Sequence, residues 1–242
     1  LGGPTRRGKT AQKIAMLNEI DLCTRNLITV EDPIGAELPD ARQIEINPKA
    51  DITFAKTLRS VLRQDPDVIC VGEIRDDETA QNALRASQTG HLVLATIHCD
   101  GNTAAMIRLM DLGVSAMLLS SGLSALVSQR LLRKLCEHCK KPAELTRGMI
   151  LELREKRTDY KHIFDAVGCE GCDGTGYSGR TAICSIVTVT DELRADIADN
   201  RALTSEMRTK GARKDRTNLR KEGRRKVASG ITSLQELKRV VG

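Results

Sequence analysis

The pattern of apolar and polar positions divides most of the chain into short β-rich runs separated by helical stretches. Four runs have the length and residue types of strands: LITVED (27–32), QIEI (43–46), DVICVG (67–72) and HLVLAT (91–96). Apolar residues recur at helical spacing over Lys9–Leu17, Phe54–Leu62, Thr79–Ala86 and Thr103–Leu112. Continuous apolar runs such as VICV are typical of strands buried on both faces, so the pattern predicts an α/β sheet flanked by helices.

The pattern changes after residue 113. Ser115–Leu135 carries apolar residues at helical spacing and predicts one long helix. Residues 136–180 hold two CxxC pairs and a glycine-rich segment, and TAICSIVTV (181–189) predicts a strand that charged helices follow from Asp191 onward. We therefore expect three parts, over residues 1–113, 114–190 and 191–242.

Composition and charge narrow the class of protein. The 242 residues are 40% hydrophobic and 29% charged, which suits one large domain or two small ones. Neither a run of about 18 apolar residues nor a secretory signal is visible, so the chain is expected to be cytosolic.

The net charge of +6 is concentrated near the C-terminus, where residues 205–241 hold twelve Lys or Arg against four Asp or Glu. Such a segment could contact nucleic acid, an anionic membrane or an acidic partner, or form a solvated helix face. The chain has no tryptophan, two tyrosines and two phenylalanines. These leave almost no surface for base stacking, so we expect no nucleic-acid partner.

The opening segment matches a phosphate-binding loop of the pattern G-x-x-x-x-G-K-[ST]. In such a loop backbone amides surround phosphate oxygens, the lysine reaches the β- and γ-phosphates and the hydroxyl binds Mg²⁺. The alternative is a glycine-rich turn that caps a helix. The candidate nucleotide-binding residues are Gly3, Pro4, Thr5, Arg6, Arg7, Gly8, Lys9 and Thr10. No buried strand precedes this loop, so we expect the chain to be a piece of a longer protein.

Acidic residues follow two of the apolar runs. Glu31 and Asp32 end the first, and Glu73 and Asp76 follow DVICVG. Ligands of open α/β sheets bind at the carboxyl ends of strands, which makes Glu73 a candidate for the Mg²⁺ shell or for orienting the attacking water. Glu31 is then a candidate for polarising that water. Surface acids at ordinary strand ends are the alternative.

His98 closes a third run and could donate a hydrogen bond to a γ-phosphate oxygen, although a lone histidine is more often structural. Three arginines near these segments could neutralise phosphate charge or pair with Asp65, Asp67 and Asp76; they are Arg59, Arg63 and Arg75. The candidate catalytic residues are Lys9, Glu31, Glu73 and His98, with Thr10 and Glu73 as magnesium ligands.

Four cysteines have the spacing of metal ligands. Cys136 and Cys139 form one CxxC pair and Cys169 and Cys172 the other, with 29 residues between the pairs. Closing this loop rather than one of about 18 residues costs roughly 0.4 kcal/mol more, against about 10–16 kcal/mol for structural zinc. Disulfides are the alternative, but a cytosolic chain keeps thiols reduced, so a closed structural zinc site is favoured.

Seven segments together resemble one family. They read GPTRRGKT, LITVEDPI, LRQDPDVICVGEIRDDETA, QTGHLVLATIH, QRLLRKLCEHCKKP, GCEGCDGTGYSGR and GITSLQEL. In this order they resemble the phosphate loop, acidic box, atypical Walker B segment, histidine box and tetracysteine module of the type II secretion and type IV pilus assembly ATPases. The resemblance covers almost the whole chain.

The resemblance implies a RecA-like P-loop ATPase core over residues 1–113, a tetracysteine zinc module within 114–190 and a basic helical region over 191–242. It also implies ATP, Mg²⁺ and Zn²⁺ as cofactors. The implied assembly is a cytoplasmic homo-hexamer, peripheral to the inner membrane, that acts on an inner-membrane platform protein to drive pilin or pseudopilin assembly.

Three departures from the family pattern concern the site. Arg6-Arg7 stands in place of Gly-Ser, Gly35 in place of Glu, and Cys99-Asp100 in place of Thr-Asn. The family also has an N-terminal domain that supplies arginines to the site, and this chain does not include it. We therefore expect a poor ATPase. The alternative function is a zinc-stabilised binding or scaffold module that has lost turnover; a chaperone-type zinc knuckle would need several CxxCxGxG repeats, and only one is present.

Overall fold

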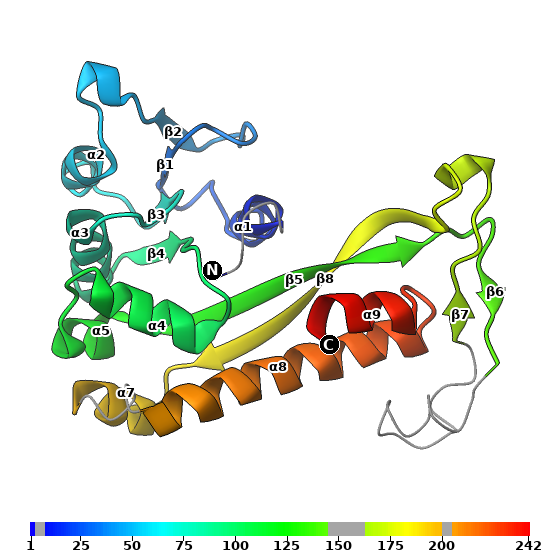
Figure 1. Ribbon diagram of the computed structural model, residues 1–242. Helices are drawn as coiled ribbons and strands as arrows, with labels where there is room; N and C mark the ends of the chain where they lie inside the picture. Colours follow the sequence, from blue (N-terminus) through cyan, green and yellow to red (C-terminus); the bar gives the residue numbers. More distant parts are fainter. Residues whose placement is uncertain (3–7, 145–162, 200–204) are drawn as a thin grey trace. The chain divides into compact units, whose positions relative to one another are not determined.

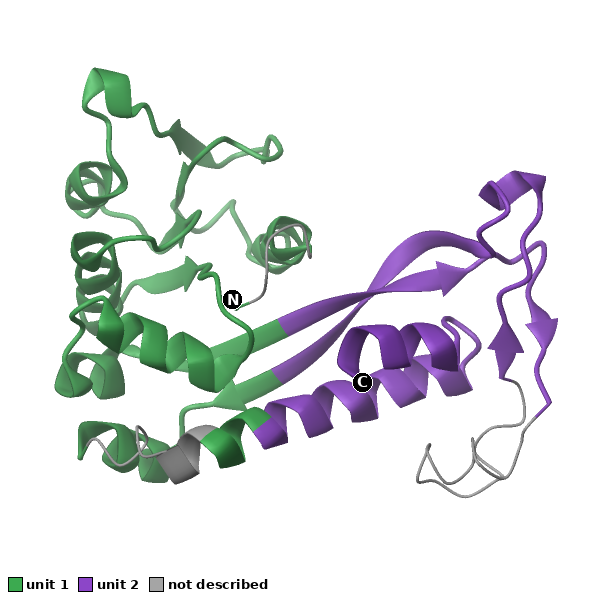
Figure 2. Cartoon of the chain, in the orientation of Figure 1, with its two compact units in different colours: residues 1–128, 186–212 green, residues 129–185, 213–242 purple. Residues whose placement is uncertain are grey.

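The computed structural model describes residues 1–2, 8–144, 163–199 and 205–242 (Figure 1). Within it the chain forms two compact units, one of residues 1–128 and 186–212, the other of residues 129–185 and 213–242 (Figure 2). The three parts expected from the sequence stay a prediction, because these units are defined by contacts and not by function.

A four-stranded sheet organises the first unit. Its strands are β1 (Leu27–Glu31), β2 (Arg42–Glu45), β3 (Val68–Val71) and β4 (Leu92–Ala95). All three pairings are parallel and the order is β2-β1-β3-β4. The predicted α/β class is confirmed, and every predicted strand of this sheet is present within two residues of its expected bounds.

The two faces of this sheet carry different helices. Ile28 and Val30 of β1 and Ile69 and Val71 of β3 belong to the core cluster that includes residues of α2 (Phe54–Val61), α3 (Asp77–Gln88), α4 (Asn102–Asp111) and α5 (Ala116–Gly122). Leu27, Val68 and Cys70 belong to the opposite cluster, with Leu17 of α1 (Lys9–Leu17). Figure 1 shows α1 on one side of the strands and α2 and α3 on the other. Because side chains alternate along a strand, Thr29 and Glu31 share the α1 face with Leu27.

Side-chain caps begin most of the other helices. In each case the hydroxyl or carboxylate of the N-cap residue accepts a hydrogen bond from an amide in the first turn, a contact typically worth about 1 kcal/mol. The caps are Thr53 for α2, Asp76 for α3, Ser115 for α5, Thr190 for α7 (Asp191–Ala198) and Ser233 for α9 (Leu234–Val241). A 3-10 turn, η1 (Pro48–Ala50), precedes α2.

The single long helix expected over Ser115–Leu135 is wrong. The structure has the short helix α5 and then the strand β5 (Ala125–Leu135), which pairs with β8 (Tyr177–Thr188). Local apolar spacing fits a helix here, but pairing with a strand about 50 residues away satisfies the backbone and overrides it. Both strands pass from one unit to the other, since the boundaries follow Ser128 and Ser185.

The second unit has its own core. Its core cluster draws on β5, β8, the two C-terminal helices α8 (Ser205–Ala228) and α9, and the residue before Phe164. The buried members are Leu132, Ile163, Ile183, Leu219, Val227, Leu234, Leu237 and Val241. A small antiparallel pair, β6 (Lys141–Pro142) and β7 (Phe164–Asp165), and the 3-10 turn η3 (Glu170–Cys172) also belong to this unit. None of the helices in the described ranges has the length and apolar content needed to cross a membrane.

A buried carboxylate joins two elements of this second core. Glu236 of α9 is 1% exposed, and it accepts hydrogen bonds from the backbone amide and the guanidinium of Arg133 on β5. Arg239, one turn further along α9, donates two more. Burial raises the pKa of Glu236, but the hydrogen bonds from Arg239 and Arg133 outweigh it and lower this pKa to about 2.

Candidate nucleotide site and cysteine centre

The first two residues of the chain lie at the open edge of the parallel sheet. The amino group of Leu1 donates to the carbonyl of Ala95 at 2.7 Å, and the amide of Ile97 donates to the carbonyl of Leu1 at 2.9 Å. The amide of Gly2 donates to the carbonyl of Val127 on β5 at 2.7 Å. Residues 1–2 therefore occupy a strand position between the β4 end and β5, and they direct the chain toward the phosphate loop.

The loop itself is only partly described. Gly3, Pro4, Thr5, Arg6 and Arg7 lie outside the described residues. Gly8 follows with a φ of 79°, a left-handed conformation that favours glycine, and Lys9 and Thr10 form the first turn of α1. This end of the helix presents backbone amides and partial positive charge, which suit an anion.

A cleft opens where α1 meets the carboxyl ends of the strands, and its volume is about 320 Å³. It is lined by Gly8, Lys9, Thr10, Lys13, Glu31, Asp32, Pro33, Gly35, Gly72, Glu73 and Thr96. Four of the residues singled out in the sequence, Lys9, Thr10, Glu31 and Glu73, thus meet in one cleft. The fold brings them together because parallel strands present their carboxyl ends at one edge of the sheet.

His98 does not join this group among the described residues. Its side chain is exposed, and it does not line the cleft. His91, at the start of the same run, has the structural role that a lone histidine usually has: its Nδ1 lies 3.0 Å from the carbonyl of Ala86. A phosphate contact by His98 stays a prediction.

Lys9 carries the clearest mark of an anion site. Its Nζ is buried and has no hydrogen-bond partner in the described part of the chain, and its nearest opposite charge is Oε1 of Glu73 at 3.9 Å. A buried ammonium without hydrogen bonds is unfavourable, so the cleft is suited to an anionic ligand that accepts from it. The observed residues therefore fit the phosphates of a nucleotide.

Glu73 has a second cationic neighbour. Nε of Arg75 donates to Oε2 of Glu73 at 2.8 Å, and Nη1 of Arg75 donates to Oδ2 of Asp32 at 3.0 Å. The hydrogen bond with Glu73, more than the charge of Asp32, raises the pKa of Arg75. Arg75 thus links the acidic ends of two neighbouring strands.

The sequence left open which of three arginines lies near the candidate phosphate site. The structure distinguishes them by their contacts. Only Arg75 contacts the acids of the cleft, whereas Arg59 pairs with Glu78 on the outer side of α3. The expected aspartate partners are engaged elsewhere: Asp67 accepts from the amide of Asn26, and Asp76 caps α3.

Glu31 is enclosed by donors. It is 4% exposed, and Nζ of Lys13 lies 2.5 Å from its Oε2. Thr29 Oγ1 and Gln43 Nε2 donate to Oε1 at 2.9 and 3.1 Å. Burial raises the pKa of Glu31, but the hydrogen bond and charge of Lys13 outweigh this and lower it. Sequence reasoning missed Lys13, although its position four residues after Lys9 places both on one helix face.

Two glycines allow the cleft to close around its polar groups. A Cβ on Gly72 would lie 3.0 Å from the carbonyl oxygen of Val30 and 3.1 Å from Cα of Glu31. A Cβ on Gly35 would lie 2.8 Å from Cγ2 of Thr10. Gly35 therefore packs directly on the helix turn that carries the candidate magnesium ligand.

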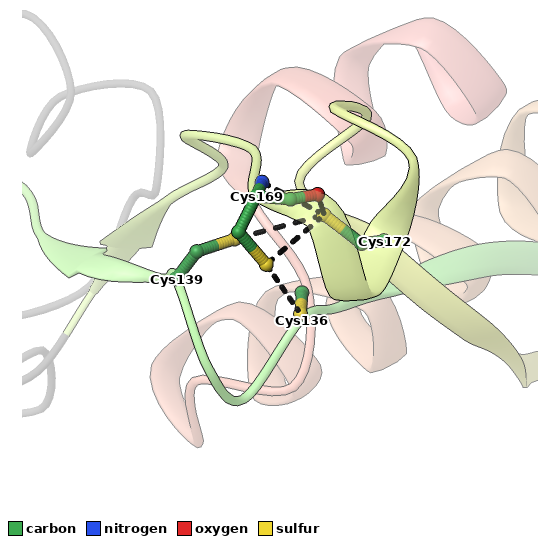
Figure 3. Close-up of side chains that lie close together, drawn as sticks. All are labelled: Cys136, Cys139, Cys169 and Cys172. Carbon is green, nitrogen blue, oxygen red and sulfur yellow. Dashed lines mark hydrogen bonds between the residues drawn. The ribbon is translucent and has the colours of Figure 1, made fainter.

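The second candidate centre is the cysteine cluster, which Figure 3 shows with the four sulfurs facing one another. Sγ–Sγ distances are 4.0 Å between Cys136 and Cys169, 3.8 Å between Cys139 and Cys172, and 3.7 Å between Cys169 and Cys172. A tetrahedral site with Zn–S bonds of about 2.3 Å has sulfur–sulfur edges of about 3.8 Å. The four cysteines predicted from spacing thus have the geometry of a tetrathiolate site.

The backbone around η3 favours a thiolate in this cluster. Burial raises the pKa of Cys172, but the amides of Cys169 and Gly176, each 3.2 Å from its sulfur, lower this pKa to about 6. Figure 3 shows the Cys169 amide directed at that sulfur. Burial and the neighbouring sulfurs raise the pKa of Cys169 to about 12. The amides around η3 thus favour the thiolate form of Cys172, which is the form of cysteine that binds metal.

Disulfides are excluded at these positions in the structure, because all eight cysteines are free and the sulfur distances far exceed the about 2.05 Å of a disulfide. His138, which lies inside the first CxxC pair, is exposed, and the group of potential metal ligands in the described ranges consists of the four cysteines. Cys70, which has no CxxC partner, is a buried core residue, and burial raises its pKa to about 12.

Comparison with protein families identifies relatives of the whole chain. The family model described as type II/IV secretion system protein matches residues 1–239. The type II secretion system protein HxcR of Pseudomonas aeruginosa is 44% identical over 241 residues, covering 98% of this chain and 47% of HxcR. The type IV pilus assembly ATPase PilB of Thermus thermophilus is 42% identical over 240 residues, covering 97% of this chain and 26% of PilB. The chain thus spans at most about half of these relatives.

Solved structures support the same fold. The pilus retraction motor PilT with bound ADP superimposes with a TM-score of 0.64 and 26% sequence identity, covering 98% of this chain and 59% of PilT. The Legionella pneumophila ATPase DotB, at 21% identity and a TM-score of 0.62, shows the fold alone.

Proposed function

Because the chain belongs to the family of type II/IV secretion system proteins, we propose that the cleft beside α1 binds ATP with Mg²⁺ and hydrolyses it. The observation that supports this most directly is Lys9, whose buried ammonium has no hydrogen-bond acceptor in the described residues and lies in a cleft with Thr10 and Glu73. The relatives add that PilB is named an ATPase and that PilT is titled with bound ADP.

Each residue of the cleft has a distinct task in this proposal. Lys9 and the amides at the start of α1 bind phosphate oxygens. Gly3, Pro4, Thr5, Arg6, Arg7 and Gly8 are assigned to the same site by their match to the phosphate-loop motif alone. The hydroxyl of Thr10 and the carboxylate of Glu73 hold the metal ion, and Glu73 orients the attacking water. Bound Mg²⁺ supplies charge neutralisation of the phosphates. His98 donates to the γ-phosphate when the nucleotide is present, in keeping with its place after β4.

The work that hydrolysis drives follows from the relatives. We propose that the chain acts as a motor in protein secretion or in the assembly of pilins or pseudopilins, as a homo-hexamer. Its partner would be an inner-membrane platform protein. The chain would act from the cytoplasm, at the periphery of the inner membrane, and would bind no nucleic acid. The names of HxcR and PilB support these two uses equally, so the choice between secretion and pilus assembly stays open.

The cysteine cluster completes the proposal as a structural Zn²⁺ site. Four sulfurs fill a tetrahedral shell and leave no position for a substrate, so the metal would stabilise rather than catalyse. The cluster joins the segment after β5 to η3, and thereby fixes two segments separated by about 30 residues.

One observation favours a second function. Gly35 provides no carboxylate at the edge of the cleft, and it packs against Thr10. A chain with this residue, and with Arg6-Arg7 in its loop, could bind nucleotide and zinc as a scaffold derived from such a motor, with turnover impaired.

Hydrolysis and binding measured on the same protein distinguish the two functions. For the motor, ATP hydrolysis should require Mg²⁺ and should disappear in Lys9→Ala, while Lys56→Ala, a control at an exposed lysine of the same unit, should behave as the unchanged protein. Equal hydrolysis by the unchanged protein and Lys9→Ala contradicts the motor. Nucleotide binding that depends on Lys9, without hydrolysis, supports the scaffold.

A further inference from the structure

Lys13 is a buried charge that the roles above do not use. It is 4% exposed, lies on the face of α1 that meets the sheet, and lines the cleft beside Lys9. Its ammonium contacts Glu31 Oε2 at 2.5 Å, and both side chains are 5% exposed. A lysine almost never lies this deep without a partner, and the charge of Glu31 is that partner.

The contacts of Glu31 leave little of its carboxylate available. Oε2 accepts from Lys13, and Oε1 accepts from Thr29 and Gln43, so donors from α1, β1 and β2 meet at one group. A general base must accept the proton of water at an accessible oxygen, and its pKa must lie near the working pH. An enclosed carboxylate bound to an ammonium meets neither condition.

Glu73 differs in its accessibility. Its side chain is 24% exposed in the same cleft, Lys9 is 3.9 Å away, and its hydrogen bond with Arg75 comes from a half-exposed guanidinium. Water can therefore reach Glu73, and a ligand that draws Lys9 away would leave that side of the carboxylate open.

We propose that Lys13 is a positioning residue that holds Glu31 as a fixed anion in the wall of the cleft, so that Glu73 alone contacts the attacking water. The part of this assignment that concerns the attacking water rests on the proposed ATP hydrolysis. The ion pair between Lys13 and Glu31, called the ionic lock below, does not depend on that function. It revises the sequence-based role of Glu31 as a group that polarises water.

The contacts of Glu31 extend to the loop that approaches Thr10. Gln43, which donates to Glu31, also donates to the carbonyl of Ala36 and accepts from the amide of Leu38. The segment between β1 and β2 contains Gly35, whose backbone lies against Thr10. Through Gln43, Glu31 is thus linked to the loop whose Gly35 packs against the side chain of Thr10.

Three other titratable groups among the described residues lie near the pair or share its helix face. Cys70 of β3 interacts with both charges of the pair, and burial raises the pKa of its thiol to about 12. The amino group of Leu1 lies near Cys70, and burial lowers its pKa. Lys9 shares the helix face but contacts Glu73. The variants below leave these groups unchanged. Their titration therefore contributes equally to the melting temperature of each variant and does not affect the comparison.

Three variants test the lock without relying on turnover: Lys13→Met, Glu31→Gln, and the double variant, which removes both charges. In Lys13→Met the buried carboxylate has lost its ammonium, so its pKa rises above the unfolded value and stability is lost as pH increases through it. Melting temperatures between pH 5.5 and 8.0 should therefore fall for Lys13→Met relative to the double variant. Glu31→Gln should show the opposite trend, because a buried lysine without its carboxylate has a lowered pKa.

The outcomes separate the lock from the proposed function. The lock is overturned if the difference in melting temperature between a folded single variant and the double variant does not change with pH. If the protein hydrolyses ATP, the double variant should keep its rate within about tenfold, whereas Glu73→Gln should lose about 100-fold or more, the range for a lost acid–base group. Equal losses in both would show that Glu31 also acts on water and would overturn the positioning role. Absence of hydrolysis in the unchanged protein contradicts the motor and leaves the melting test decisive for the lock.

Discussion

Nζ of Lys9 lies 3.9 Å from Oε1 of Glu73, inside a cleft where that ammonium has no hydrogen-bond acceptor among the residues described. The two side chains come from different segments, one from the first turn of α1 and the other from the segment after β3. The pair therefore marks the place where phosphate and metal would replace the ion pair in the proposed nucleotide complex.

Replacing Lys9 should reduce nucleotide affinity strongly. A hydrogen bond to a charged group contributes about 1.5–3 kcal/mol, so Lys9→Ala should weaken binding of a fluorescent ADP analogue by roughly 10- to 100-fold. Titration with Lys56→Ala as the matched exposed-lysine control measures the effect. An affinity that stays within error of the control would mean that the cleft does not bind phosphate through Lys9.

Adding a methyl group at Gly72 should disturb the end of β1. The new Cβ would approach the Val30 carbonyl and Cα of Glu31 to about 3 Å, contacts that the sheet backbone can relieve only by moving. Gly72→Ala should therefore lower stability by about 1–3 kcal/mol, as overpacking usually does. Gly171→Ala, where the nearest atom would be a cysteine sulfur at 3.8 Å, is the uncrowded control in the second unit. Chemical denaturation of both variants checks the difference.

The tetrathiolate geometry predicts one bound zinc per chain. Cys136→Ser should lose the metal and melt at a lower temperature, because structural zinc contributes directly to folding. Cys23→Ser, at an exposed cysteine outside the cluster, should retain the zinc and the melting temperature of the unchanged protein. Elemental analysis together with melting curves gives the result, and purified protein without zinc would argue against the site.

Acid should destabilise the second unit through Glu236. Its pKa is lowered to about 2, below the unfolded value of about 4.3, so its stabilisation is present above the unfolded pKa and is lost as pH falls toward 2. We expect a loss on the order of 2 kcal/mol, since the two arginines are partly exposed and their charges are screened. Glu236→Gln should be less stable at pH 7 and should lose less on acidification. Denaturation curves at pH 7 and pH 3 measure this, and parallel losses in both proteins would refute it.

The elements of the parallel sheet and the kinds of reactive side chain can be predicted from the amino-acid sequence alone. Uninterrupted apolar runs such as VICV have one stable environment, a strand covered on both faces, so the strands of this sheet and α1 were predicted nearly to the residue. The spacing of Cys136, Cys139, Cys169 and Cys172 likewise predicted a cluster, because two CxxC turns can each contribute two sulfurs to one ion.

Which charged side chains contact one another cannot be predicted without the folded structure. Lys13 has no motif, and its contact with Glu31 depends on α1 packing against the particular face of β1 that carries Thr29 and Glu31. The change from helix to strand in β5 depends in the same way on β8, a partner distant in the chain. The spacing of apolar residues indicates which secondary structure a segment favours locally. Ion pairs and strand pairing depend on contacts that exist only after the chain has folded.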